Sequence, residues 1–189
     1  MKEISRKNFF KKACISTACM CGFSAIALSN SNDDTEQGSS EKDANQLLVK
    51  TWLSSLLSNI NKELDEEAKR SILKSCSTVH YDNLKMDEML QPYIGNLEAF
   101  IGLLQESWGW KVDYDKAAKT ILANEDKDFC VCPMINQNDD KDKSAICYCS
   151  EGFAEKMFSV VAGEPVMATV ISSIHRGDDK CIYKVEMKG

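Results

Sequence analysis

The fold class follows from SEGFAEKMFSVVAGEPVMATVISSIHRGDDKCIYKVEM, which runs from Ser150 to Met187. Ser150 is a favourable N-cap, and the apolar side chains after it recur at helical spacing until Gly163, a residue type that commonly ends helices. Two apolar segments, Val166–Ile174 and Cys181–Met187, then flank a polar turn. We predict a helix over Glu151–Ala162 followed by an antiparallel hairpin.

The first half of the chain carries apolar side chains at helical spacing. They predict a helix over Gln46–Leu64, a helical continuation over Asp65–Lys74 and a third helix between Met86 and Leu104. Pro92 is predicted to start or kink the third helix, because its ring removes a hydrogen-bond donor. The predicted fold is therefore α+β, with N-terminal helices packed on an antiparallel sheet and one helix inserted between hairpins.

The middle of the chain is predicted to supply the other strands. Lys119–Ala123 and Phe129–Ile135 lie on either side of the polar segment Asn124–Lys127, which is typical of a hairpin turn. Ser144–Tyr148 is predicted to be the next strand.

Two Cys-x-Cys pairs, Cys130/Cys132 and Cys147/Cys149, lie on these predicted strands. Residues two apart on a strand project from the same face, so antiparallel pairing would place each cysteine opposite one of the other pair, with Cβ atoms about 5 Å apart. This predicts a site of four thiolates, with zinc as the expected cofactor and an iron–sulfur cluster as the alternative. Cross-strand disulfides and free buried thiols are the other two interpretations.

Cys76 and His80 form a second candidate site. They lie four residues apart, on one face if the helix continues, and are predicted to complete a metal site or to act as a nucleophile with its base. The competing interpretation is a buried cysteine beside a surface histidine. Cys181 begins an inward-facing strand and is predicted to line the core or a pocket, whereas His175, beside a polar turn, is predicted to be solvated.

Residues 1–28 have the features of an export signal. A basic segment ending at Lys12 precedes the moderately apolar segment Ala13–Leu28, which contains the small residues Ala25 and Ala27. The sequence SRKNFFK, residues 5–11, resembles a twin-arginine signal with lysine in place of the second arginine. Both the twin-arginine and the general secretory routes remain open, and the expected location is the periplasm or cell envelope.

Cleavage after Ala27 would leave a more acidic chain. It removes five of 23 Lys and Arg and one of 29 Asp and Glu, so the net charge changes from −6 to 18 − 28 = −10. Such a charge disfavours nucleic acid as a partner. Residues 29–45 are polar and acidic, and are predicted to be a disordered linker before a folded domain over 46–189. No apolar segment after the signal is long enough to span a membrane.

The segment from Cys147 to Met187 resembles the end of 4-vinyl-reductase-like domains and of bacterial proteins similar to L-2-amino-thiazoline-4-carboxylate hydrolase. The resemblance covers residues 129–187. Its shared elements are Gly152-Phe153, Pro165-Val166, Ser173-Ile174, Gly177-Asp178 and Cys181, with Cys130-x-Cys132-Pro133 and Tyr148-Cys149-Ser150 matching the hydrolase-like group. The resemblance implies an α+β fold that binds a small molecule and carries a metal site formed by cysteines.

Three functions are therefore expected, in order of preference. The first is an exported small-molecule-binding domain with a cysteine-ligated metal site. The second is a hydrolase of a cyclic C–N or C–S substrate, which would use metal-bound water or the Cys76/His80 pair. The third is a structural envelope protein stabilised by disulfides. The expected partners are a small-molecule ligand and, as one arrangement, a second copy of the chain.

Overall fold

The computed structural model describes residues 37–187, so the predicted export signal and the first part of the linker lie outside the described residues. Its helices are α2 (Gln37–Glu63), α3 (Glu66–Asn83), α4 (Met86–Leu90), α5 (Leu97–Ser107) and α6 (Cys147–Ala162). Its strands are β1 (Lys111–Asp115), β2 (Thr120–Asn124), β3 (Val166–Ser172) and β4 (Ile182–Met187). None of the helices between residues 37 and 187 combines the length and apolar character needed to cross a membrane.

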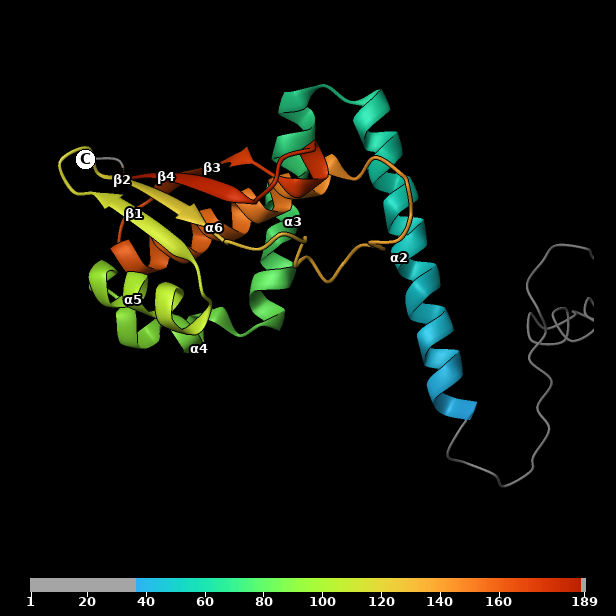
Figure 1. Cartoon of the computed structure of the whole chain (residues 1–189), viewed down its shortest axis with the longest axis horizontal. Helices are drawn as coiled ribbons and strands as arrows, with labels where there is room; N and C mark the ends of the chain where they lie inside the picture. Colours follow the sequence, from blue (N-terminus) through green and yellow to red (C-terminus); the bar gives the residue numbers. More distant parts are fainter. Residues whose placement is uncertain (1–36, 188–189) are drawn as a thin grey trace, which may run out of the picture. The chain divides into compact units, whose positions relative to one another are not determined.

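The strands form one antiparallel sheet in the order β1-β2-β4-β3, and α6 and α5 pack against it, which confirms the α+β class (Figure 1). The predicted C-terminal hairpin is confirmed as β3 and β4, in which Val170 lies opposite Tyr183. Helix α6 packs on this hairpin, and α3 packs on α6. Gly163 ends α6 in the left-handed conformation, at φ 71°, as predicted.

The predicted strands Phe129–Ile135 and Ser144–Tyr148 are wrong. Residues 125–143 form an irregular loop, and a short 3-10 turn, Ser144–Ile146, leads directly into α6. Helix α6 lies between α3 and the sheet, so most of its side chains are buried and its first turn has no polar face. Without that contrast, Cys147-Tyr148-Cys149 has the alternation and composition of a strand.

The strand predicted at Lys119–Ala123 is present as β2, but its hairpin partner is β1, not the segment after it. Strand β1 lies at the sheet edge and was not predicted, although Val112 and Tyr114 alternate with polar residues, because this pattern spans only five residues. The third predicted helix is divided into α4 and α5 by a 3-10 turn containing Pro92. Residues 37–45, predicted to be disordered, belong to α2.

Helices α3 and α6 approach each other closely at Gly152. A Cβ on Gly152 would lie 2.5 Å from the carbonyl oxygen of Lys74, which leaves space for a glycine alone. Two ion pairs flank this contact: Arg70 Nε lies 3.1 Å from Glu151 Oε2, and Lys74 Nζ lies 2.6 Å from a carboxylate oxygen of Glu155. The close approach fixes the α6 side chains relative to those of α3.

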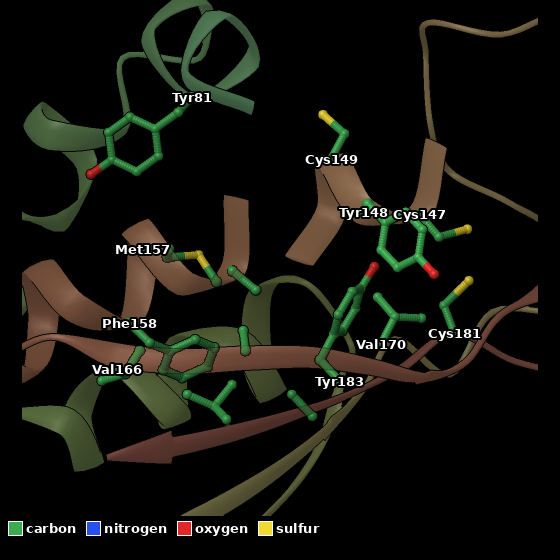
Figure 2. Packing of buried hydrophobic residues seen from close by; sticks show 14 of the residues in the cluster. Tyr81, Cys147, Tyr148, Cys149, Met157, Phe158, Val166, Val170, Cys181 and Tyr183 are labelled. Carbon is green, nitrogen blue, oxygen red and sulfur yellow. The ribbon is translucent and has the colours of Figure 1, made fainter. Parts of the chain in front are cut away.

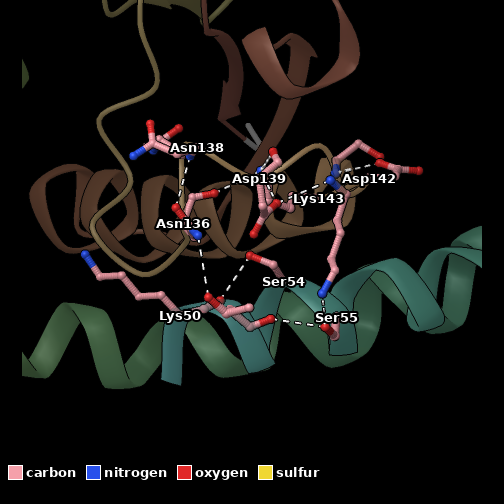
Figure 3. A network of polar contacts seen from close by, with 12 residues as sticks. Lys50, Ser54, Ser55, Asn136, Asn138, Asp139, Asp142 and Lys143 are labelled. Atoms are coloured by element: carbon pink, nitrogen blue, oxygen red, sulfur yellow. Dashed lines mark hydrogen bonds and ion pairs between the residues drawn. The ribbon is translucent and has the colours of Figure 1, made fainter. Parts of the chain in front are cut away.

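A buried polar network joins α2 to the loop between β2 and α6 (Figure 3). Lys143 is buried, and its ammonium donates to Asp139 Oδ1 at 2.6 Å and to the carbonyl oxygens of Asp139 and Asn136 at 2.7 and 2.9 Å. On the α2 side, Thr51 accepts from the Asn136 amide at 3.5 Å, and Ser55 accepts from Lys141. The loop is therefore held in place by α2.

Asp126 lies two residues after β2 and pairs with a lysine at or beside the start of each of the two strands that flank β2, namely β1 and β4. It pairs with Lys111 at 2.8 Å and with Lys180, and these hydrogen bonds lower the pKa of its carboxyl group to about 2. Because the folded-state pKa is depressed, the stabilising contribution is present above about pH 4 and is lost as the pH falls towards 2.

We therefore expect Asp126→Asn to lower the free energy of unfolding at neutral pH. The difference in this free energy between wild type and variant should decrease as the pH falls from 4 to 2. Asparagine also tolerates the positive φ of 52° at this position, so the backbone is not strained by the change. Urea unfolding at several pH values measures the difference. A difference that does not change with pH would contradict the assignment.

Candidate functional site

A cavity of about 480 Å³ lies between α3, α6, the sheet and the loop after β2. Its lining is mainly apolar and aromatic, which is typical of a small-molecule site. Trp108 and Trp110 form part of the wall, with ring centroids 5.5 Å apart. Trp110 also stacks on Tyr183 of β4, with centroids 6.0 Å apart.

All four cysteines predicted to bind a metal line this cavity, and so does Cys181. They reach it from a loop and a helix, not from paired strands, so the predicted cross-strand geometry is wrong. Residues two apart on a helix differ by about 200° in direction, and Figure 2 shows Cys149 pointing away from Cys147 and Cys181. Among residues 37–187, no three His, Cys, Asp or Glu side chains gather closely enough to hold one ion. The described residues do not form a closed zinc site, and metal binding stays a prediction.

Four of the five cysteine thiols of the cavity have a raised pKa and are protonated at neutral pH. Burial raises the pKa to about 11 for each of Cys132, Cys147, Cys149 and Cys181. Cys147 Sγ lies 2.8 Å from Ser173 Oγ, so this thiol also has a hydrogen-bond partner. A neutral thiol is a weak nucleophile and behaves as a small apolar side chain. The cysteines therefore serve the cavity chiefly as apolar lining.

The structure places the two residues of the predicted Cys76/His80 pair in different environments, and their catalytic role stays a prediction. Cys76 is exposed, whereas His80 is half-buried, lines the cavity and packs on Phe153 with ring centroids 5.0 Å apart. No hydrogen bond joins Cys76 to His80 in the described part of the chain. The other interpretation, a buried cysteine beside a surface histidine, is wrong, because Cys76 is exposed and His80 is half-buried.

His175 and Cys181 also line the cavity. His175 is half-buried and lines the cavity, so the prediction that it is solvated is wrong. Its Nε2 is buried and has no hydrogen-bond partner among the described residues, and burial lowers the pKa of the ring. Cys181 is buried and lines the cavity, as predicted.

Glu125 is the functional candidate that the sequence did not reveal. It lies in the segment predicted to be a hairpin turn, yet it lines the cavity and is only 6% exposed. The Tyr183 hydroxyl donates to its carboxylate at 2.7 Å, and its own backbone N–H donates to the carbonyl oxygen of Cys181 at 3.1 Å. Its burial comes from the pairing of β2 with β4, a long-range contact that no local pattern encodes.

Comparison with known proteins gives two solved structures of limited similarity. Trafficking protein particle complex subunit 3 from Naegleria fowleri, covalently bound to palmitic acid, is 16% identical, with a TM-score of 0.46; the match covers 78% of this chain and 97% of that one. The phenol-responsive sensory domain of the transcription activator PoxR, with phenol, is 13% identical, with a TM-score of 0.40; the match covers 75% of each chain.

No curated protein matches the chain. One family model does, and it covers residues 23–189, which include every element of the described fold and all residues of the cavity. The chain therefore belongs to the family described as "Family of unknown function (DUF6144)".

Proposed function

We propose that this protein binds a small, mainly apolar molecule in the cavity between α3, α6 and the sheet. The observation that supports the proposal is the cavity itself, whose volume of about 480 Å³ falls in the range of small-molecule sites. Its aromatic side chains offer large, rigid contact area to a ligand. The neutral thiols add apolar surface and no charge.

A role in ligand binding, without catalysis, accounts best for the lining. The thiols are held protonated by burial, and the predicted nucleophile Cys76 lies outside the cavity. No observation on this site favours hydrolysis over binding. Export to the periplasm or envelope remains part of the proposal, and depends on residues outside those described.

Ligand binding is testable with the neutral fluorescent probe N-phenyl-1-naphthylamine. Trp52 is the one tryptophan outside the cavity lining, so Trp52→Phe leaves Trp108 and Trp110 as the donors. We expect saturable binding of one probe per chain, with energy transfer from these two tryptophans. Non-saturable binding, or no transfer, would contradict the proposal.

Paired substitutions on β3 locate the probe. Val170 is buried and lines the cavity, whereas the next residue, Ile171, is 52% exposed. We expect Val170→Phe to fill the cavity and weaken probe binding about tenfold or more, which corresponds to about 1.4 kcal/mol. The matched change Ile171→Phe should leave affinity unchanged. Native mass spectrometry of the same samples would reveal bound zinc or an iron–sulfur cluster if the metal prediction holds.

A further inference from the structure

The buried carboxylate of Glu125 indicates the chemical class of the ligand. We infer that the cavity selects an apolar or aromatic molecule bearing a protonated amine, and that Glu125 holds this amine. The inference rests on the proposed function, because it concerns the same cavity. It starts from the position of Glu125, which is more than nine-tenths buried and lines the cavity.

The hydrogen bonds of Glu125 are incomplete. An ionised carboxylate has about four acceptor positions, and the described residues supply one side-chain donor, the Tyr183 hydroxyl at 2.7 Å. None of the ion pairs within 4.0 Å in this part of the chain includes Glu125. A buried charge is costly unless it is paired and hydrogen-bonded. A ligand ammonium would supply both the donors and the opposite charge.

The groups around Glu125 favour a cation over an anion. Trp108, Trp110 and Tyr183 lie on the same side of the cavity, and the faces of such rings attract ammonium groups. The two lining histidines contribute no positive charge at neutral pH, because burial lowers the pKa of each ring.

Lys127 is the one lysine or arginine among the residues that line the cavity. It partly offsets the effect of burial on the pKa of Glu125, which remains raised, and its ammonium lies close to Gly109, between the two tryptophans. It does not pair with Glu125 within 4.0 Å. Because Lys127 has the same charge as the inferred ligand group, it should weaken amine binding, and removing it should strengthen that binding.

Three matched molecules test the inference by displacement of N-phenyl-1-naphthylamine: 4-phenylbutylamine, 4-phenylbutanol and 4-phenylbutanoate. They differ in the terminal group, which is cationic, neutral or anionic. We expect the amine to bind wild-type protein about tenfold more tightly than the alcohol, the size of effect produced by a hydrogen bond to a charged group. The butanoate should bind most weakly.

Glu125→Gln should remove the preference for the amine over the alcohol, since the amide carries no negative charge but can still accept from Tyr183. Lys127→Met should increase amine affinity. A melting temperature close to that of the wild-type protein in each variant would show that the fold is intact. Equal binding of the three molecules, tighter binding of the butanoate, no displacement by the amine, or an amine preference that survives in Glu125→Gln would overturn the inference. If the probe itself does not bind, the proposed function fails. If the probe binds but the amine shows no preference, only the inference about the amine fails.

Discussion

Gly152→Ala is expected to reduce the free energy of unfolding by about 3 kcal/mol, at the upper end of the usual cost of overpacking. The new Cβ would lie 2.5 Å from the carbonyl oxygen and 2.9 Å from the Cα of Lys74, and 2.6 Å from Ser77 Oγ. Two of these atoms belong to the backbone of α3, so a side-chain rotation cannot relieve the contact. Helices α3 and α6 must move apart.

Gly102 offers a matched control, because it also lies within a helix and a Cβ there meets nothing within 4 Å. Gly102→Ala should stabilise the protein by up to about 1 kcal/mol through helix propensity alone. Urea unfolding followed by circular dichroism measures both variants. Probe binding should also weaken in Gly152→Ala, since His80 on α3 and Phe153 on α6 both line the cavity. Similar unfolding midpoints for the two variants would show that the helix contact is looser than described.

Phe158→Ala is expected to cost about 4 kcal/mol, the usual range for removing a fully buried phenylalanine. Phe158 lies on α6, is 1% exposed, and contacts Phe100 of α5 edge to face, with ring centroids 5.4 Å apart. Its loss leaves a cavity that the surrounding side chains fill only in part. Since domains of this size are stable by about 5–15 kcal/mol, the variant should approach the limit of folding.

Ile171→Ala is the control for Phe158→Ala, because Ile171 is exposed and its truncation removes an apolar side chain without creating a cavity. Its effect should stay within about 0.5 kcal/mol. Thermal unfolding of both variants checks the contrast. Comparable losses of stability would mean that the face of β3 carrying Ile171 is covered by something other than water.

The sequence was most informative where burial is one-sided. Strands β3 and β4 and helices α3 and α5 each bury one face, and this produces the spacing that predicts them. Helix α6 was predicted from Glu151 onward, but its first turn was mistaken for a strand because buried residues surround Cys147, Tyr148 and Cys149 on all sides. The edge strand β1 was missed because its alternation is short and its only two apolar side chains, Val112 and Tyr114, are half-buried.

The candidate site was predicted in composition and not in geometry. All four cysteines of the predicted metal site line one cavity, together with Cys181. They lie on a loop and on a helix that packs against it, and not on two paired strands. Glu125 had no signal of its own, because an acidic residue in a polar segment is ordinarily solvated. It is buried because β2 pairs with β4, which places Tyr183 next to it, and these two strands are far apart in the chain.

The loop after β2 serves two neighbours at once. Its first part, Cys130–Met134, lines the cavity, and its second part is held to α2 by Asn136, which donates to Thr51, and by Lys141, which donates to Ser55 (Figure 3). A ligand that moves the loop would therefore also act on its contacts with α2. By linkage, a partner of α2 whose binding such a ligand changes would alter the affinity for the ligand by the same factor.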